Sequence, residues 1–177
     1  MDGDHTLEVC SEVTERVLRT VFRELYTQRV KLEGMILKPN MVLPGLTCPR
    51  QKTVEEVADA TVGCLLRSVP AAVPGIVFLS GGQSGELASA RLNAMNVRYR
   101  SHLPWELSFS FGRAIQEPAL GIWRGERANI IPAQEALYHR AKCDRAAHRG
   151  EYTPAVEAAH RESTAHHMTD VYAGSAK

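Results

Sequence analysis

Apolar positions follow a helical period near the start of the chain and an extended pattern soon after it. One face of a helix that begins soon after His5 would carry Val13, Val17, Leu18, Val21, Phe22 and Leu25. Residues 30–37 are predicted to form a strand with its most apolar part at the end. Pro39 ends this strand, because a residue before proline favours extended backbone. Lys38 is therefore expected at the C-terminal end of a strand.

The same two patterns then repeat along the chain. Thr53 and Glu56 have the spacing of a capping box, which predicts a helix up to Pro70. The apolar run 75–79 lies between turn residues and fits a strand buried on both faces. Ser84 is placed to cap the helix that follows. Residues 105–111 alternate as a third strand, and further helices are predicted over 114–123 and 132–147.

Strands that alternate with helices predict an α/β protein with a parallel sheet built from βα units. In such sheets the functional groups lie on the loops at the C-terminal ends of the strands. These positions hold Lys38, Ser80 and Arg113. Residues 151–177 contain few large apolar side chains, and we expect them to form a flexible tail.

Composition narrows the class of protein. The chain has 177 residues, 44% hydrophobic and 23% charged, which is enough for one ordinary globular core. Its net charge of +1 gives no general attraction to nucleic acid or to an anionic membrane. From its sequence we expect neither a signal peptide nor a long apolar span. We therefore expect a cytoplasmic protein whose basic residues act locally.

Metal and disulfide chemistry are not expected from the cysteines and histidines. The four cysteines lack both CxxC spacing and a neighbouring histidine pattern, and we expect free thiols at Cys10, Cys48, Cys64 and Cys143. The polar C-terminal segment contains three histidines that we expect to be solvated: His160, His166 and His167. We predict no metal and no other cofactor.

The three strand ends carry residues suited to one kind of chemistry. A lysine among apolar neighbours loses hydration, which favours the neutral amine that attacks carbonyls. Alternatively, Lys38 is an ordinary lysine that extends into solvent. Ser80-Gly81-Gly82 can cradle a phosphate with backbone N–H groups at a helix start, or it is a simple turn. Arg113 after Gly112 can bind two phosphate oxygens, or it pairs with a helix carboxylate.

Taken together, three ordered segments resemble the C-terminal half of class I fructose-bisphosphate aldolase. They are Leu37-Lys38-Pro39-Asn40-Met41 with Pro44-Gly45, then Phe78-Leu79-Ser80-Gly81-Gly82-Gln83-Ser84, then Phe109-Ser110-Phe111-Gly112-Arg113-Ala114. The resemblance runs from about Asp2 to about Pro154. It implies a (β/α)8 TIM barrel, of which residues 1–150 would form about the last three βα units and a C-terminal helix.

The resemblance also implies a reaction and roles for residues. Lys38 would form a Schiff base with the ketose, and the substrate phosphate would be held by Ser80, Gly81, Gly82, Gly112 and Arg113. The implied reaction is reversible cleavage of fructose 1,6-bisphosphate into dihydroxyacetone phosphate and glyceraldehyde 3-phosphate, a glycolytic step that needs no metal. The full-length family is expected to form homo-oligomers. A tyrosine near the C-terminus usually reaches the active site, and Tyr172 is the candidate here.

The resemblance begins after the fifth barrel strand, so the family's proton-transfer residues have no counterparts here. Three interpretations follow: a fragment or misplaced start of an aldolase, a product that pairs with a separate N-terminal half, or a non-catalytic phosphosugar-binding or interaction protein. A transaldolase-like Schiff-base enzyme is disfavoured by the order of the three segments. We predict little or no aldolase activity for this chain alone.

Overall fold

The computed structural model describes residues 2–159. Its α-helices are α1 (Leu7–Thr27), α2 (Val54–Ser68), α3 (Gly85–Tyr99), α4 (Arg113–Trp123) and α5 (Ile130–Arg149). Its strands are β1 (Ile36–Leu37), β2 (Gly75–Phe78) and β3 (Glu106–Phe109). Short 3-10 turns are η1 (Leu32–Gly34), η2 (Arg100–His102) and η3 (Arg127–Asn129). The alternation of helices and strands predicted from the sequence is thus confirmed.

The three strands form one parallel sheet in the order β1-β2-β3. Gly75 is the partner of Ile36 on one side and of Glu106 on the other. All three strands therefore end at the same edge of the sheet, as the predicted βα units require. In the described part of the chain, β1 and β3 each have a strand neighbour on one side only.

The first strand is much shorter than predicted. The extended run expected over 30–37 is interrupted by η1, in which the Gly34 N–H donates to the Lys31 carbonyl at 3.2 Å. Pairing nevertheless continues beyond β1, because the Leu79 N–H donates to the Pro39 carbonyl at 3.1 Å. This bond holds the chain around Lys38 beside the end of β2.

Local capping signals fix where the helices begin and end. Both hydrogen bonds of the predicted capping box are present, between Thr53 and Glu56 at the start of α2. The Ser84 side chain accepts a bond from the Leu87 N–H at the start of α3. Helix α5 begins and ends two residues outside the predicted 132–147, and it stops at Gly150, whose φ of 77° suits glycine.

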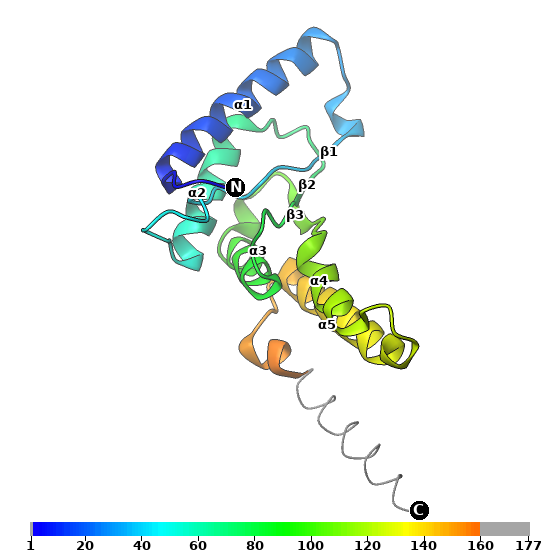
Figure 1. The fold of residues 1–177 in the computed structure, drawn as a ribbon. Helices are drawn as coiled ribbons and strands as arrows, with labels where there is room; N and C mark the ends of the chain where they lie inside the picture. Colours follow the sequence, from blue (N-terminus) through cyan, green and yellow to red (C-terminus); the bar gives the residue numbers. More distant parts are fainter. Residues whose placement is uncertain (1, 160–177) are drawn as a thin grey trace, which may run out of the picture.

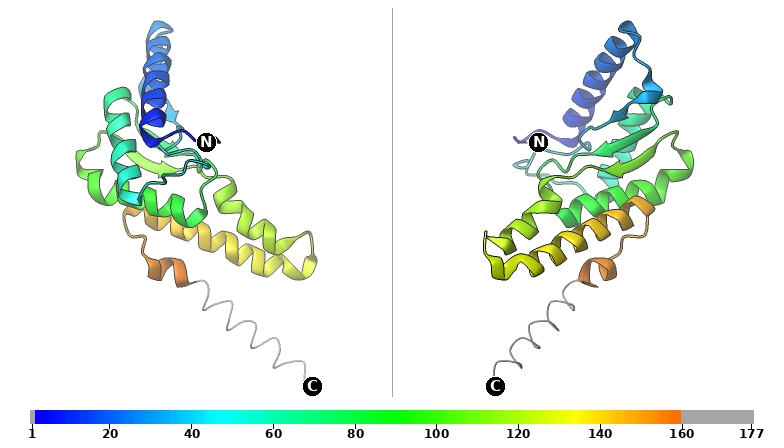
Figure 2. Two further views of the ribbon diagram at one scale, coloured as in Figure 1. Left: turned by 60° about the vertical axis from the view of Figure 1, so that its left-hand side comes forward. Right: turned by 90° about the vertical axis from the view of Figure 1, so that its right-hand side faces the viewer.

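The helices follow one another around the sheet (Figures 1 and 2). Helix α1 packs on α2, α2 on α3, and α5 on both α3 and α4. The core lies between the sheet and these helices, and its largest fully buried apolar side chains include Val57, Leu65, Ile76, Phe78, Leu92, Met95 and Leu107. None of the helices within residues 2–159 combines the length and apolar character needed to cross a membrane.

The apolar face predicted for α1 is wider than the face that packs. Leu18 and Phe22 are buried in the core. On the same helix, exposed fractions of 42%, 53% and 41% are found for Val13, Val17 and Val21. The shared apolar face is thus only partly buried, because α1 meets α2 and the core along only one side.

Candidate functional site

The loops after the three strands surround a cavity of about 600 Å³. All six residues predicted to bind or react with a substrate line it: Lys38, Ser80, Gly81, Gly82, Gly112 and Arg113. The remaining lining residues are Asp2, Leu46, Leu79 and Ser110. The structure therefore brings together groups that are separated by up to 75 positions between Lys38 and Arg113 in the sequence.

Lys38 reaches this cavity from the loop that follows β1. Its surroundings differ from the prediction, because Lys38 is exposed and β1 contributes only two residues before it. The described residues therefore do not supply the apolar environment that we expected to remove water from this amine. What they supply is position, through the bond between Leu79 and Pro39 described above.

The Ser80-Gly81-Gly82 loop has a backbone that only glycine adopts without strain. The φ angles of Gly81 and Gly82 are 61° and 83°, both in the left-handed region. The Gln83 N–H donates to the Ser80 carbonyl at 3.2 Å and closes the turn. Two successive glycines in this conformation let the main chain approach a ligand without a Cβ between them.

A buried pair of polar side chains supports this loop from behind. The Gln83 amide donates to the Ser80 carbonyl at 2.8 Å and accepts from the Arg91 guanidinium at 2.8 Å. Arg91 is only 4% exposed, and burial lowers the pKa of its guanidinium. Its Nε–H has no partner in the described part of the chain. Gln83 is thus the main polar support for both the loop and a buried cation.

We expect Gln83→Ala to lower the free energy of unfolding by about 2–3 kcal/mol, because it leaves a buried guanidinium without an acceptor. The measurement is the urea midpoint at an unchanged slope. Gln116→Ala is the matched control, since Gln116 is exposed on α4. A Gln83→Ala protein within about 0.5 kcal/mol of the parent, the range of ordinary surface substitutions, would show that the support is not needed.

The third strand end presents a helix N-terminus to the cavity. Gly112 precedes α4, and no side chain of the described residues caps this end. The first N–H groups of a helix lack intrahelical acceptors and attract anions. Arg113 is exposed beside them and forms no ion pair within residues 2–159, so the alternative of a salt bridge to a helix carboxylate is not realised there.

Charge in the cavity is predominantly positive. Lys38 and Arg113 contribute cations, and Asp2 contributes the one carboxylate among the described lining residues. Asp2 was not among the residues predicted to lie at this site. Tyr172, the predicted tail tyrosine, lies outside the described residues. A cavity with an amine, a guanidinium and a helix N-terminus suits a phosphorylated carbonyl compound.

Comparisons with known proteins point in one direction. The family model described as "Glycolytic: Fructose-bisphosphate aldolase class-I" matches residues 1–172. Fructose-bisphosphate aldolase B of Sparus aurata is 52% identical over 157 residues, which is 89% of this chain and 43% of the relative. Fructose-bisphosphate aldolase B of Gallus gallus is 55% identical over 153 residues, or 85% of this chain and 41% of the relative.

A solved structure agrees with these sequence matches. Fructose-bisphosphate aldolase from Plasmodium falciparum, in a complex with TRAP and a small-molecule inhibitor, superposes with a TM-score of 0.82 at 47% identity. The match covers 86% of this chain and 43% of that one. The chain thus spans less than half the length of the relatives it matches, and its three parallel strands correspond to a partial barrel.

Proposed function

Because this chain belongs to the class I fructose-bisphosphate aldolase family, we propose that Lys38 is a Schiff-base amine that acts on a phosphorylated ketose. The observation that carries this proposal is the shared cavity at the three strand ends, which holds Lys38, the Ser80-Gly81-Gly82 loop and Arg113. A single amine beside two anion-binding elements matches a substrate with one carbonyl and one phosphate.

The chemistry follows from these groups. The Lys38 amine attacks the ketose carbonyl carbon, and loss of water gives a protonated imine. The imine withdraws electrons, so the pair left when the C3–C4 bond of fructose 1,6-bisphosphate breaks is held as an enamine. The C4 hydroxyl loses its proton as glyceraldehyde 3-phosphate leaves, and protonation of the enamine at C3 restores the imine. Hydrolysis of that imine releases dihydroxyacetone phosphate and the free Lys38 amine. In this proposal no metal takes part.

The phosphate contacts position the carbonyl for this attack. We propose that the backbone of Gly81, Gly82 and Gly112, the Ser80 hydroxyl and the Arg113 guanidinium bind one substrate phosphate. Fixing the phosphate holds the carbonyl near the amine and makes the attack effectively intramolecular. Since Lys38 is exposed, this positioning is expected to contribute more than desolvation.

Borohydride trapping tests the phosphate requirement. Dihydroxyacetone phosphate should give a reduced adduct at much lower concentration than dihydroxyacetone, which has no phosphate to bind. Arg113→Ala should raise the half-saturating concentration of dihydroxyacetone phosphate about 10–100-fold, because a charge-assisted hydrogen bond contributes about 1.5–3 kcal/mol. The control is Arg127→Ala on η3, outside the cavity lining. Equal half-saturation in Arg113→Ala and the parent would contradict the role of Arg113.

Proton transfer limits what the chain can do by itself. Asp2 is the one carboxylate among the described lining residues, and complete turnover requires groups that protonate and deprotonate the substrate. We therefore expect imine formation but little or no cleavage of fructose 1,6-bisphosphate by the purified 177-residue chain. A coupled assay for glyceraldehyde 3-phosphate measures this, and turnover at a rate typical of enzymes would refute it.

The alternative function is non-catalytic binding of a sugar phosphate. It predicts retained binding of dihydroxyacetone phosphate without any reduced adduct. We further propose a cytoplasmic role in glycolysis, homo-oligomers in the longer protein and no nucleic-acid partner. Tyr172 stays the candidate for the tyrosine near the C-terminus that reaches the active site. The proposed domain boundary stays at residue 150, although Tyr152 and Glu157 contact α3 and α5.

A further inference from the structure

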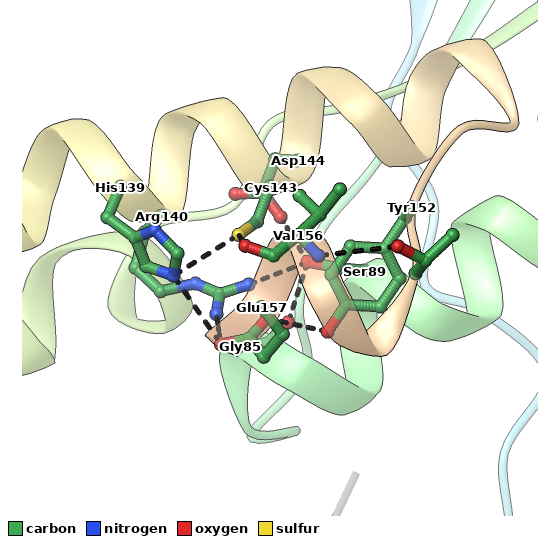
Figure 3. Close-up of polar contacts among 10 residues, drawn as sticks. Gly85, Ser89, His139, Arg140, Cys143, Asp144, Tyr152, Val156 and Glu157 are labelled. Atoms are coloured by element: carbon green, nitrogen blue, oxygen red, sulfur yellow. Dashed lines mark hydrogen bonds and ion pairs between the residues drawn. The ribbon is translucent and has the colours of Figure 1, made fainter. Parts of the chain in front are cut away.

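A second polar cluster lies away from the strand ends, between α3, α5 and the segment that follows Gly150 (Figure 3). Its centre is formed by His139 and Cys143 of α5 and by Glu157, which the chain brings back against α5. One ligand atom of each of these residues lies within 4.8 Å of the others. This corrects the prediction that no cysteine has a neighbouring histidine pattern, because His139 and Cys143 are four residues apart on one helix.

We propose that His139, Cys143 and Glu157 form a zinc site. The Cys143 Sγ lies 3.4 Å from the His139 Nε2, and that nitrogen lies 3.8 Å from the Glu157 Oε1. Tetrahedral zinc, at about 2.3 Å from sulfur and about 2.0 Å from nitrogen or oxygen, separates such atoms by about 3.3–3.6 Å. The two separations that involve His139 are within about 0.2 Å of this range, and the Cys143 sulfur lies within 4.8 Å of a Glu157 oxygen.

The donor set favours zinc over a harder cation. A thiolate, an imidazole and a carboxylate are the three ligand types found in protein zinc sites, whereas calcium and magnesium prefer oxygen alone. Three protein ligands leave a fourth position. A cavity of about 380 Å³ is lined by His139, Arg140 and Glu157, so the open side of the site is reachable by water and by the ion.

Neighbouring groups hold the glutamate in place, as outer-shell residues do in metal sites. Glu157 accepts a bond from the Tyr152 hydroxyl at 2.6 Å through one oxygen and from Arg140 through the other. Both carboxylate oxygens of Glu157 are therefore held in place close to His139 and Cys143.

The net charge of the cluster without a metal ion is negative, which favours binding of a cation. Glu157 and Asp144 contribute two carboxylates against the single guanidinium of Arg140. Asp144 accepts from Ser89 through one oxygen, and its other oxygen has no partner in the described residues. Zinc with the Cys143 thiolate adds one net positive charge, which balances the cluster. The ion would also tie the segment after Gly150 to α5.

Cobalt substitution in the 177-residue chain tests the site. Co²⁺ should bind one to one and give a thiolate-to-cobalt charge-transfer band that zinc displaces. The band should disappear in Cys143→Ser and His139→Gln and persist in Cys48→Ser, which alters a buried thiol outside the cluster. It should also persist in a chain with His160, His166 and His167 replaced by alanine. Absence of the band from the parent, or its survival in Cys143→Ser, would overturn the proposal.

Measured zinc affinities of variants distinguish a zinc site from a cluster that only stabilises the fold, because they change only if these residues bind zinc. Glu157→Gln should weaken zinc binding more than about 100-fold, since loss of an outer-shell partner alone costs about 10–100-fold. Tyr152→Phe should weaken it about 10-fold while Cys48→Ser leaves it unchanged. Zinc should slow amide hydrogen exchange over residues 152–157. Zinc affinity that is equal in the parent and Glu157→Gln would contradict a ligand role for Glu157.

Discussion

Lys38→Met is expected to abolish the borohydride-reduced adduct with dihydroxyacetone phosphate. The substitution keeps a flexible side chain of similar length but removes the amine that must attack the carbonyl. Because Lys38 is exposed, the change should cost little stability. Intact mass after trapping should therefore show unmodified protein under conditions in which the parent chain gains one reduced adduct.

Two further variants test whether Lys38 acts as the attacking amine or only as a positive charge. Lys31→Met is the matched control, because Lys31 is exposed in the same segment but does not line the cavity. It should trap as the parent does. Lys38→Arg keeps a cation but cannot form the imine, so it should bind dihydroxyacetone phosphate without an adduct. An adduct of undiminished yield in Lys38→Met would assign the chemistry to another amine.

Gly45→Ala is expected to cause the largest loss of stability among small substitutions in the loop after β1. A Cβ at Gly45 would lie 2.1 Å from the Gly3 carbonyl oxygen and 2.6 Å from the Gly3 carbonyl carbon. These are main-chain atoms, which cannot rotate away as the end of a flexible side chain can, so the backbone of one segment would have to shift. Two bonds join the same segments, from the Gly45 N–H to the His5 carbonyl at 2.8 Å and from the Thr47 N–H to the Gly3 carbonyl at 3.0 Å.

We expect Gly45→Ala to lower the free energy of unfolding by about 2–4 kcal/mol, from overpacking and the loss of these bonds. Urea unfolding at an unchanged slope measures it. The control is Gly121→Ala on α4, where a Cβ meets nothing within 4 Å and alanine should stabilise the helix by up to about 1 kcal/mol. If Gly45→Ala unfolds at the parent's urea midpoint, the close approach of the two segments is wrong.

The places of the candidate site residues at the strand ends could be predicted from the sequence, but the environment of their side chains could not. Lys38, Ser80 and Arg113 follow the three apolar runs, and parallel strands bring their C-terminal ends together. Gly81 and Gly82 were predicted to let backbone N–H groups approach an anion, and their left-handed φ angles suit such an approach. These features depend on local pattern and sheet direction alone, which is why they were predictable.

Features that depend on tertiary packing were missed. The η1 turn interrupts the predicted first strand, although the apolar pattern of residues 30–37 suits either conformation. On α1, Leu18 and Val17 are equally apolar, and only the place of α2 decides which is buried. The bond between Gln83 and Arg91 spans eight residues and has no sequence signature.

The cluster around Cys143 could be predicted only in part from the sequence. The spacing of His139 and Cys143 is visible in the sequence and marks one face of a helix. Glu157 joins them only because the chain turns at Gly150 and the next segment packs against α3 and α5. A search for pairs four residues apart would have found the first two residues and not the third.

The most direct test of the central claim is a peptide map of the 177-residue chain after borohydride reduction with dihydroxyacetone phosphate. The proposed site predicts a single modified residue, Lys38, and predicts that inorganic phosphate protects it by occupying the anion site formed by the Ser80-Gly81-Gly82 loop and Arg113. Modification spread over the exposed lysines, or unaffected by phosphate, would contradict a Schiff-base site at the three strand ends.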